Sequence, residues 1–339
     1  MEALSCHDDR DPWMAAMRRG DFAAAWAISD AVVAEHRARG EPCWHWPRHL
    51  QYVWTGEPLA GRRVLVRCYH GLGDTLQFIR FAAPLRRIAA HVTVWVQPAL
   101  APLVAGAEGV DAVLPLHDGT PEVDYDVDIE IMELAHALRV TPERLGPVPY
   151  LAAPRPASLP DGGPHDDATP RVGFVWRAGG WNPDRSVPTP LMARLFVRLA
   201  RAGITPLVLQ RGLPDDERRT LVADDIGSDD VTETAARMAG LDLVVSVDTM
   251  AAHLAGALGR PCITLLSQDS DWRWMRHRTD TPWYPTMRLV RVPPGGGWTD
   301  ALATLEAMLT QRARASHSPA THTHAEAPPA AKGRPPSKQ

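Results

Sequence analysis

From residue 63 to residue 312, short apolar runs alternate with segments whose apolar residues recur at helical spacing. In the first half, the predicted strands are 63–68, 92–97, 113–116 and 127–131, and the predicted helices are 75–90 and 99–107. After a segment rich in Pro, Gly and Asp, the pattern restarts. Its predicted strands are 171–176, 205–210, 243–247, 262–266 and 287–292, and its predicted helices are 191–202, 233–239 and 299–312. This alternation is typical of parallel sheets covered by helices on both faces, so it predicts two α/β units.

The pattern also predicts what flanks the two units. Residues 12–39 carry an apolar helical face that Gly20 and Asp21 divide into two helices, with a turn like those of tetratricopeptide repeats. A single helix pair cannot bury its own core, so we expect it to pack on the domain that follows. The predicted divisions are a helical arm (1–58), a first Rossmann-like domain (59–153), a linker (154–170), a second Rossmann-like domain (171–314) and a disordered tail (315–339).

Composition excludes several classes of function. The 339 residues carry a formal net charge of −4 with no basic stripe, so no nucleic-acid partner is expected. No apolar run approaches the roughly 20 residues that span a bilayer, and the first residues do not resemble a signal peptide. The four cysteines have no paired spacing, which favours reduced thiols in the cytoplasm. Cys43, His45 and His49 lack a nearby fourth ligand, so no metal site is predicted there.

One candidate site follows the first predicted strand. Gly71 and Gly73 would let the backbone turn sharply and approach a ligand, and Asp74 would stand at the mouth of the cleft. The segment lacks the third glycine of a dinucleotide fingerprint, which argues against a dehydrogenase. Two roles for Asp74 remain open: a helix cap with Gln77 reaching back, or a general base.

A second candidate site joins the strand 243–247 to the helix that follows. Asp248, Thr249 and His253 lie at the carboxyl end of a strand, where a helix N-terminus, a hydroxyl and an imidazole suit a diphosphate. The alternative is that Asp248 caps the helix and His253 is a half-buried helix residue.

Two further loops follow strands of the second unit. The loop after 171–176 contains Gly179 and Gly180, and Arg177 or Arg185 could meet a diphosphate there or remain a solvated surface arginine. The loop around Gln210 could contact a base or ribose.

These segments together resemble one protein family. The stretches Gly-Leu-Gly-Asp-Thr-Leu-Gln-Phe-Ile-Arg, Val-Trp-Arg-Ala-Gly, Leu-Gln-Arg-Gly and Val-Ser-Val-Asp-Thr-Met-Ala-Ala-His-Leu-Ala-Gly occur in this order, followed by Asp-Trp-Arg-Trp and Pro-Trp-Tyr-Pro. Over residues 61–312 the chain resembles bacterial glycosyltransferase family 9, the lipopolysaccharide heptosyltransferase-like group, and most of all its tetratricopeptide-linked branch. The resemblance implies a GT-B fold, with two Rossmann-like, doubly wound domains facing a cleft. It also implies inversion at the sugar carbon, no metal, and a nucleoside-diphosphate sugar such as ADP-heptose as donor, held mainly by the second domain.

The resemblance also assigns roles. It makes Asp74 the general base, and it gives the donor contacts to Asp248, Thr249 and His253 and to the loop 176–185. That loop lacks the lysine typical of heptosyltransferases, so an arginine must substitute or the contact is lost.

The sequence therefore predicts an inverting glycosyltransferase that acts on a glycan or lipid-linked acceptor. We expect it in the cytoplasm, with peripheral contact to the inner membrane left open. The alternative is a binding protein of the same fold without turnover. The aromatic residues Trp272, Trp274, Trp283 and Tyr284 are expected to be structural and to link the last strands to the first domain.

Overall fold

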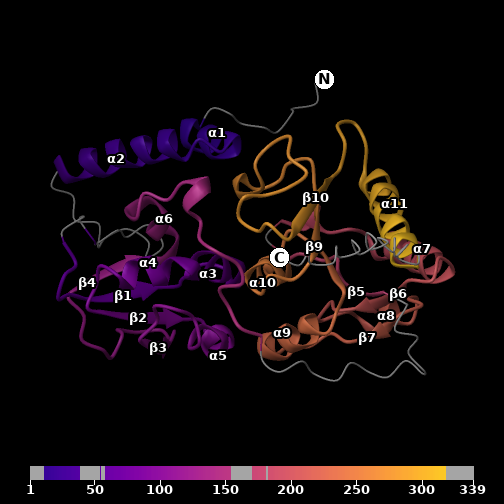
Figure 1. The fold of residues 1–339 in the computed structure, drawn as a ribbon, viewed down its shortest axis with the longest axis horizontal. Helices are drawn as coiled ribbons and strands as arrows, with labels where there is room; N and C mark the ends of the chain where they lie inside the picture. Colours follow the sequence, from indigo (N-terminus) through magenta and orange to yellow (C-terminus); the bar gives the residue numbers. More distant parts are fainter. Residues whose placement is uncertain (1–10, 39–53, 55–57, 154–169, 181, 318–339) are drawn as a thin grey trace, which may run out of the picture.

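The computed structural model describes residues 11–38, 54, 58–153, 170–180 and 182–317 (Figure 1). Most of the predicted linker, the Cys43–His45–His49 group and most of the predicted tail lie outside these residues.

The arm consists of the two predicted helices, α1 (Pro12–Arg19) and α2 (Phe22–Ala38). Asp11 caps α1 by accepting hydrogen bonds from the amides of Trp13 and Met14. Gly20 ends the helix with a φ of 77°, a backbone conformation that favours glycine. The predicted division of the arm at residue 20 is confirmed.

The first unit contains a four-stranded parallel sheet in the order β3-β2-β1-β4. Its strands are β1 (Arg63–Arg67), β2 (His91–Val96), β3 (Ala112–Pro115) and β4 (Val127–Glu130), close to the predicted ranges. Its helical segments are α3 (Leu72–Phe78), η3 (Ile79–Phe81), α4 (Ala82–Arg86), η4 (Pro98–Leu100), α5 (Ala101–Val104), η5 (Ile131–Glu133), α6 (Leu134–Ala137) and η6 (Pro142–Arg144).

The prediction of a single helix over residues 75–90 is wrong. The first helical turn begins at Leu72, and the α-helix gives way to a 3-10 turn at 79–81 before α4 begins. Pro84 explains the interruption, because it has no N–H to donate to the carbonyl of Arg80 and its ring crowds that carbonyl.

The second unit contains a six-stranded parallel sheet in the order β10-β9-β8-β5-β6-β7. Its strands are β5 (Arg171–Val175), β6 (Thr205–Val208), β7 (Asp224–Asp225), β8 (Leu243–Val247), β9 (Cys262–Leu266) and β10 (Met287–Arg291). Its helical segments are η7 (Pro183–Arg185), α7 (Thr189–Arg201), α8 (Asp215–Arg218), α9 (Val231–Ala239), α10 (Met250–Ala257), η8 (Trp272–Trp274) and α11 (Trp298–His317). The short polar strand β7 carries no apolar pattern and was not predicted. Helix α11 extends beyond 314, where the domain was predicted to end.

Both sheets have a point where the strand order reverses, between β1 and β4 and between β5 and β8. Open α/β sheets bind ligands outside the carboxyl ends of the strands at such points. Helix α3 follows β1, α10 follows β8, and the two helices pack against each other. Figure 1 shows them side by side where the two units meet. The fold therefore brings two candidate ligand edges together.

The arm contacts both units, and the expectation that it packs simply on the following domain is incomplete. Trp26 donates a hydrogen bond to the carbonyl of Val140 in the first unit (2.7 Å). Phe22 packs on Trp283 of the second unit, with ring centroids 5.6 Å apart. One apolar core cluster accordingly includes residues of the arm, the first unit and the second unit.

Candidate functional site

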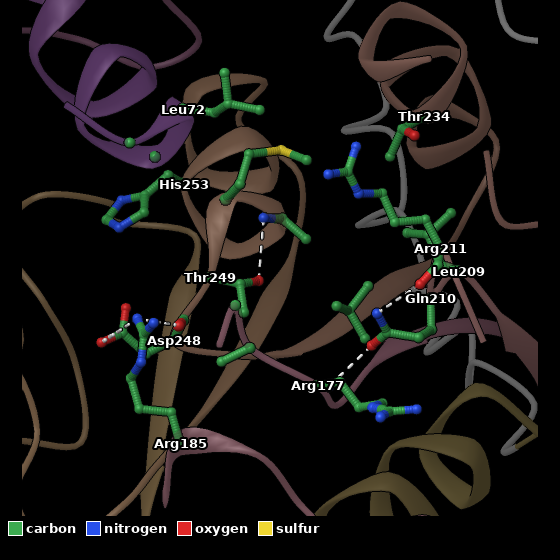
Figure 2. A pocket seen from close by; sticks show the side chains of 18 of the residues that line it. Leu72, Arg177, Arg185, Leu209, Gln210, Arg211, Thr234, Asp248, Thr249 and His253 are labelled. Carbon is green, nitrogen blue, oxygen red and sulfur yellow. Dashed lines mark hydrogen bonds and ion pairs between the residues drawn. The ribbon is translucent and has the colours of Figure 1, made fainter. Parts of the chain in front are cut away.

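A pocket of about 530 Å³ lies where α3 faces the carboxyl ends of β5, β6 and β8. Figure 2 shows side chains from these elements around it. All nine site residues predicted from the sequence line it: Gly71, Gly73, Asp74, Arg177, Arg185, Gln210, Asp248, Thr249 and His253. The fold thus brings together segments that are more than a hundred residues apart.

The corner after β8 presents the N-terminus of α10 to the pocket. Thr249, not Asp248, is the N-cap, and its hydroxyl accepts a hydrogen bond from the amide of Ala251 (3.2 Å). The alternative that Asp248 caps this helix is therefore wrong. A helix N-terminus carries unpaired amides and a partial positive charge, so this wall suits an anion.

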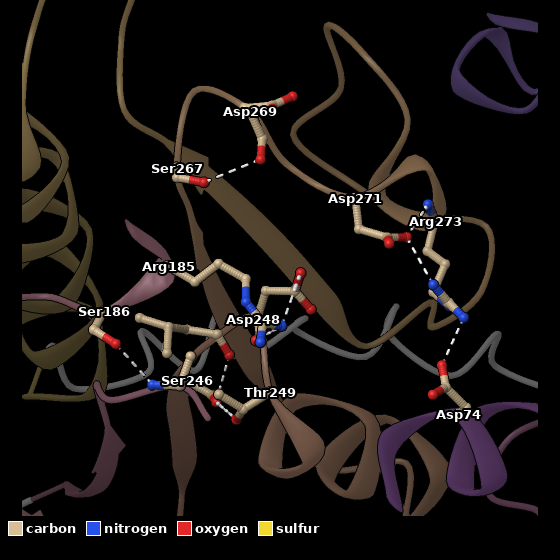
Figure 3. Close-up of polar contacts among 12 residues, drawn as sticks. Asp74, Arg185, Ser186, Ser246, Asp248, Thr249, Ser267, Asp269, Asp271 and Arg273 are labelled. Atoms are coloured by element: carbon tan, nitrogen blue, oxygen red, sulfur yellow. Dashed lines mark hydrogen bonds and ion pairs between the residues drawn. The ribbon is translucent and has the colours of Figure 1, made fainter. Parts of the chain in front are cut away.

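Asp248 instead faces Arg185. The Arg185 guanidinium donates to the Asp248 carbonyl (2.9 Å), and its Nη1 lies 3.8 Å from the Asp248 carboxylate (Figure 3). Burial and the nearby carboxylate of Asp271 raise the pKa of Asp248 to about 6, although Arg185 opposes the shift.

His253 is enclosed by aromatic residues. Its Nδ1 lies 2.9 Å from the Tyr284 hydroxyl, and its ring stacks on Trp274 at a centroid distance of 5.2 Å. Burial and the nearby Arg273 lower the pKa of His253 to about 3, so the imidazole is neutral at physiological pH. It lines the pocket without a positive charge to offer a diphosphate.

Gly73 serves a different purpose from the predicted sharp turn toward a ligand. It lies inside α3, and a Cβ at this position would be 2.9 Å from the His253 ring and 3.6 Å from the Met250 Cα. The missing side chain lets α3 approach α10 closely.

Asp74 is the third residue of α3 and belongs to an ion-pair network. One carboxylate oxygen accepts from the Gly71 amide (2.9 Å), and the other accepts from Arg273 (2.6 Å; Figure 3). Gly71 is the N-cap, so Asp74 is not the cap residue itself. Gln77 does not reach back to the helix start: its side chain is buried and makes no hydrogen bond to any described residue.

Arg273 and Asp271 were not singled out as site residues from the sequence. Arg273 is a buried cation that also donates to Asp271 (2.9 Å), so it links a carboxylate of each unit. Both residues line the pocket. In the sequence they belonged only to the Asp-Trp-Arg-Trp stretch. Arg273 lies 199 positions from Asp74 along the chain, so the sequence did not indicate their contact.

The two predicted loops of the second unit bond to each other. The Gln210 side-chain oxygen accepts from the amides of Trp176 (3.1 Å) and Arg177 (2.8 Å), and its nitrogen donates to the Arg211 carbonyl. The Gln210 side-chain amide therefore joins the ends of β5 and β6. These hydrogen bonds leave it little capacity to bind a base. The Arg177 guanidinium pairs with Glu217 at 3.1 Å.

Among the residues described, no group of three or more His, Cys, Asp or Glu is placed to hold a metal ion. The expectation that no metal is needed stays a prediction. Of the helices in the described ranges, none is both long and apolar enough to cross a membrane.

Comparison with known proteins identifies related sequences and folds. The family model "Glycosyltransferase family 9 (heptosyltransferase)" matches residues 221–293, which include β8, α10 and Arg273. Protein FlbA of Caulobacter vibrioides is 24% identical over 291 residues, which cover 76% of this chain and 48% of that protein. The chain thus spans about half the length of this relative.

Two solved structures share the architecture. A family 9 glycosyltransferase from Veillonella parvula superposes with a TM-score of 0.54 at 13% identity, covering 76% of this chain and 99% of that one. The Escherichia coli heptosyltransferase WaaC, solved with ADP-2-deoxy-2-fluoro heptose, superposes with a TM-score of 0.50 at 16% identity, covering 74% and 99%.

Two Rossmann-like units that face a pocket at their strand ends form the architecture known as the GT-B fold. Among proteins of this fold, the chain is similar over residues 221–293 to glycosyltransferase family 9 (heptosyltransferase). The predicted fold class is confirmed.

Proposed function

We propose that this protein is an inverting glycosyltransferase that transfers a sugar from a nucleoside-diphosphate donor to a hydroxyl of a glycan or lipid-linked acceptor. The observation that carries the proposal is the position of Asp74 in the same pocket as the N-terminus of α10. A base for the acceptor and an anion site for the leaving diphosphate are the two groups that such a transfer requires. ADP-heptose is the first donor to test, because WaaC was solved with an ADP-heptose analogue.

In this mechanism the Asp74 carboxylate accepts the proton of the acceptor hydroxyl. The acceptor oxygen bonds to the anomeric carbon as the bond from that carbon to the diphosphate oxygen breaks. The departing nucleoside diphosphate retains the bonding electron pair. Amides at the start of α10 stabilise its charge. The two hydrogen bonds to Asp74 use one lone pair on each oxygen, so each oxygen keeps capacity to accept the proton.

Arg273 positions the base in this proposal. It touches Asp74 across the junction of the two units and is itself held by Asp271. The carboxylate is thereby fixed, and within the described part of the chain no further group donates to its remaining lone pairs.

Asp74→Asn tests the proposal. The amide retains the shape and the bond to Gly71 but cannot serve as the base, so sugar transfer should fall by roughly 10²–10⁴-fold while donor affinity stays near the parent value. Transfer is measured with ADP-heptose, and donor affinity by calorimetry. We expect a loss of about 1–3 kcal/mol in stability, because the charged partner of a buried arginine is removed. If Asp74 only bonded to the start of the helix and did not contact Arg273, the same substitution would lower the free energy of unfolding by well under about 1 kcal/mol.

Asp271→Asn is the matched control. It also removes a carboxylate from Arg273 but leaves Asp74 intact. Transfer should fall far less than in Asp74→Asn. Equal losses in the two variants would mean that Asp74 serves only as a partner of Arg273, and near-parent transfer by Asp74→Asn would exclude it as the base.

The competing proposal is a binding protein of the same fold without turnover. The observation in its favour is that Arg185 and Arg177, the expected diphosphate contacts, both have carboxylate neighbours already. Donor binding by a parent protein that shows no transfer to any acceptor would support it. The identity of the acceptor and any contact with the inner membrane are to be tested in the same series of experiments.

A further inference from the structure

The charges around the pocket are nearly all compensated. The carboxylates of Asp74 and Asp271 share Arg273, and Asp248 faces Arg185. Arg177 pairs with Glu217. A nucleoside diphosphate brings at least two further negative charges, and these would meet three carboxylates in the same pocket. The paired arginines do not provide the excess positive charge that the diphosphate needs.

Arg211 is the cation in the pocket wall that stands apart from this network. It follows β6 and lines the pocket, and Figure 2 shows its side chain extending from the strand end into the space between α10 and Thr234. Its side chain is exposed, and its guanidinium makes no hydrogen bond or ion pair with any residue in the described part of the chain. None of its five N–H donors is used by a described residue.

The backbone around Arg211 is fixed. Gln210 binds the amides of Trp176 and Arg177, which ties the end of β6 to the end of β5. Gly212 follows with a φ of 63°, so the chain turns away directly after Arg211. This side chain is therefore presented from a rigid strand end, across the pocket from the N-terminus of α10.

We propose that Arg211 is the residue that binds the diphosphate of the donor by charge, in place of a cation from the loop 176–185. The inference rests on the proposed function, since it takes a nucleoside diphosphate to be the ligand. A guanidinium on one side and the helix N-terminus on the other would hold the diphosphate between two positive groups. The role depends on the phosphates and not on the nucleoside.

The test compares binding of ADP, UDP and GDP, and of the matching nucleosides, to the full chain by calorimetry at low and high salt. Arg211→Gln should weaken binding of the preferred nucleoside diphosphate by about 10- to 100-fold at low salt, and high salt should reduce the difference. Nucleoside binding should be unchanged. Arg211→Lys should recover most of the affinity, because it restores the charge. Arg219→Gln is the control for general loss of charge, since Arg219 is also exposed but does not line this pocket.

The outcomes separate two failures. If the parent binds none of the three nucleoside diphosphates, the proposed function fails and the inference fails with it. If the parent binds one of them and Arg211→Gln binds it equally well, the inference alone is wrong. If Arg211→Gln loses nucleoside and nucleoside diphosphate in the same proportion, Arg211 contacts the nucleoside and the inference is again wrong.

Discussion

At the scale of single residues, the surroundings of His253 change what this side chain is expected to do. The sequence placed it one turn into the helix that follows the strand 243–247, which suggested that it binds a diphosphate. Its stacking on Trp274 and its contact with Tyr284 make it part of the core that joins α10 to the aromatic residues after β9.

We therefore predict that His253→Ala mainly destabilises the protein. Removing a buried ring leaves a cavity and takes one hydrogen-bond partner from the Tyr284 hydroxyl, so we expect a loss of about 2–4 kcal/mol in the free energy of unfolding. Urea denaturation measures it. Donor affinity, measured under conditions where the variant is folded, should stay within about threefold of the parent value. A stable variant with much weaker binding would return His253 to the donor site.

Glu130 is a buried carboxyl near Asp74 that the sequence did not single out. One of its oxygens accepts from the amide of Met132 (2.7 Å), and the other lies 3.6 Å from His70. Burial raises the pKa of Glu130 from 4.5 to about 8, and the carboxylates of Glu133 and Asp74 add to the shift.

This shift predicts a pH dependence of stability. A carboxyl with a raised pKa binds its proton more tightly in the folded protein than in the unfolded one. Its contribution to the free energy of unfolding is therefore full below pH 4.5 and is lost as the pH rises to about 8. Glu130→Gln keeps the bond to Met132 and does not ionise, so it should remove this loss and stabilise the protein at pH 8 by on the order of 1–3 kcal/mol. If the free energies of unfolding of variant and parent change with pH in parallel, Glu130 has the same pKa in the folded and the unfolded protein and this prediction is wrong.

At the scale of helices and strands, the sequence was a good guide where apolar residues dominate. β5, β8 and β9 and the divided arm match their predicted positions because buried parallel strands and a glycine-terminated helix leave strong local patterns. The pattern failed at 75–90, where Pro84 interrupts the helix, and at β7, which has only two residues, both polar.

The candidate site was predictable to a similar degree. Motifs at strand ends identified nine residues that line one pocket, because strand ends converge in parallel sheets. The partners of those residues were not predictable. The contact between Asp74 and Arg273 depends on how two units pack, and no local pattern records it.

The contact between α3 and α10 predicts an effect of Gly73→Ala. A Cβ would lie 2.9 Å from the buried His253 ring, so α3 and α10 must separate slightly. We expect a loss of about 1–3 kcal/mol by urea denaturation. Gly179→Ala is the control, because a Cβ there has no atom within 4 Å. Equal stability of the two variants would mean that the helices adjust without cost.

At the scale of the whole molecule, the arm and both units share one apolar core. The ring of Phe22 in the arm packs on Trp283 of the second unit, and Trp283 packs on Phe78 of the first, with ring centroids 5.8 Å apart. The expectation that the aromatic residues after β9 link the last strands to the first domain is confirmed for Trp283 by its contact with Phe78. A second cluster belongs to the second unit alone.

A shared core predicts that damage in the arm is felt in the second unit. Phe22 is buried between Trp26 and Trp283, so Phe22→Ala should cost about 3–5 kcal/mol. Hydrogen exchange followed by mass spectrometry should show faster exchange in α10 and β9 as well as in α1 and α2, because the cavity opens in a core that all of them border. Val32→Ala is the control within the arm, since Val32 is 46% exposed and should change stability by less than about 0.5 kcal/mol. If Phe22→Ala speeds exchange in the arm alone, the arm is a separate unit that packs on the two α/β units without stabilising them.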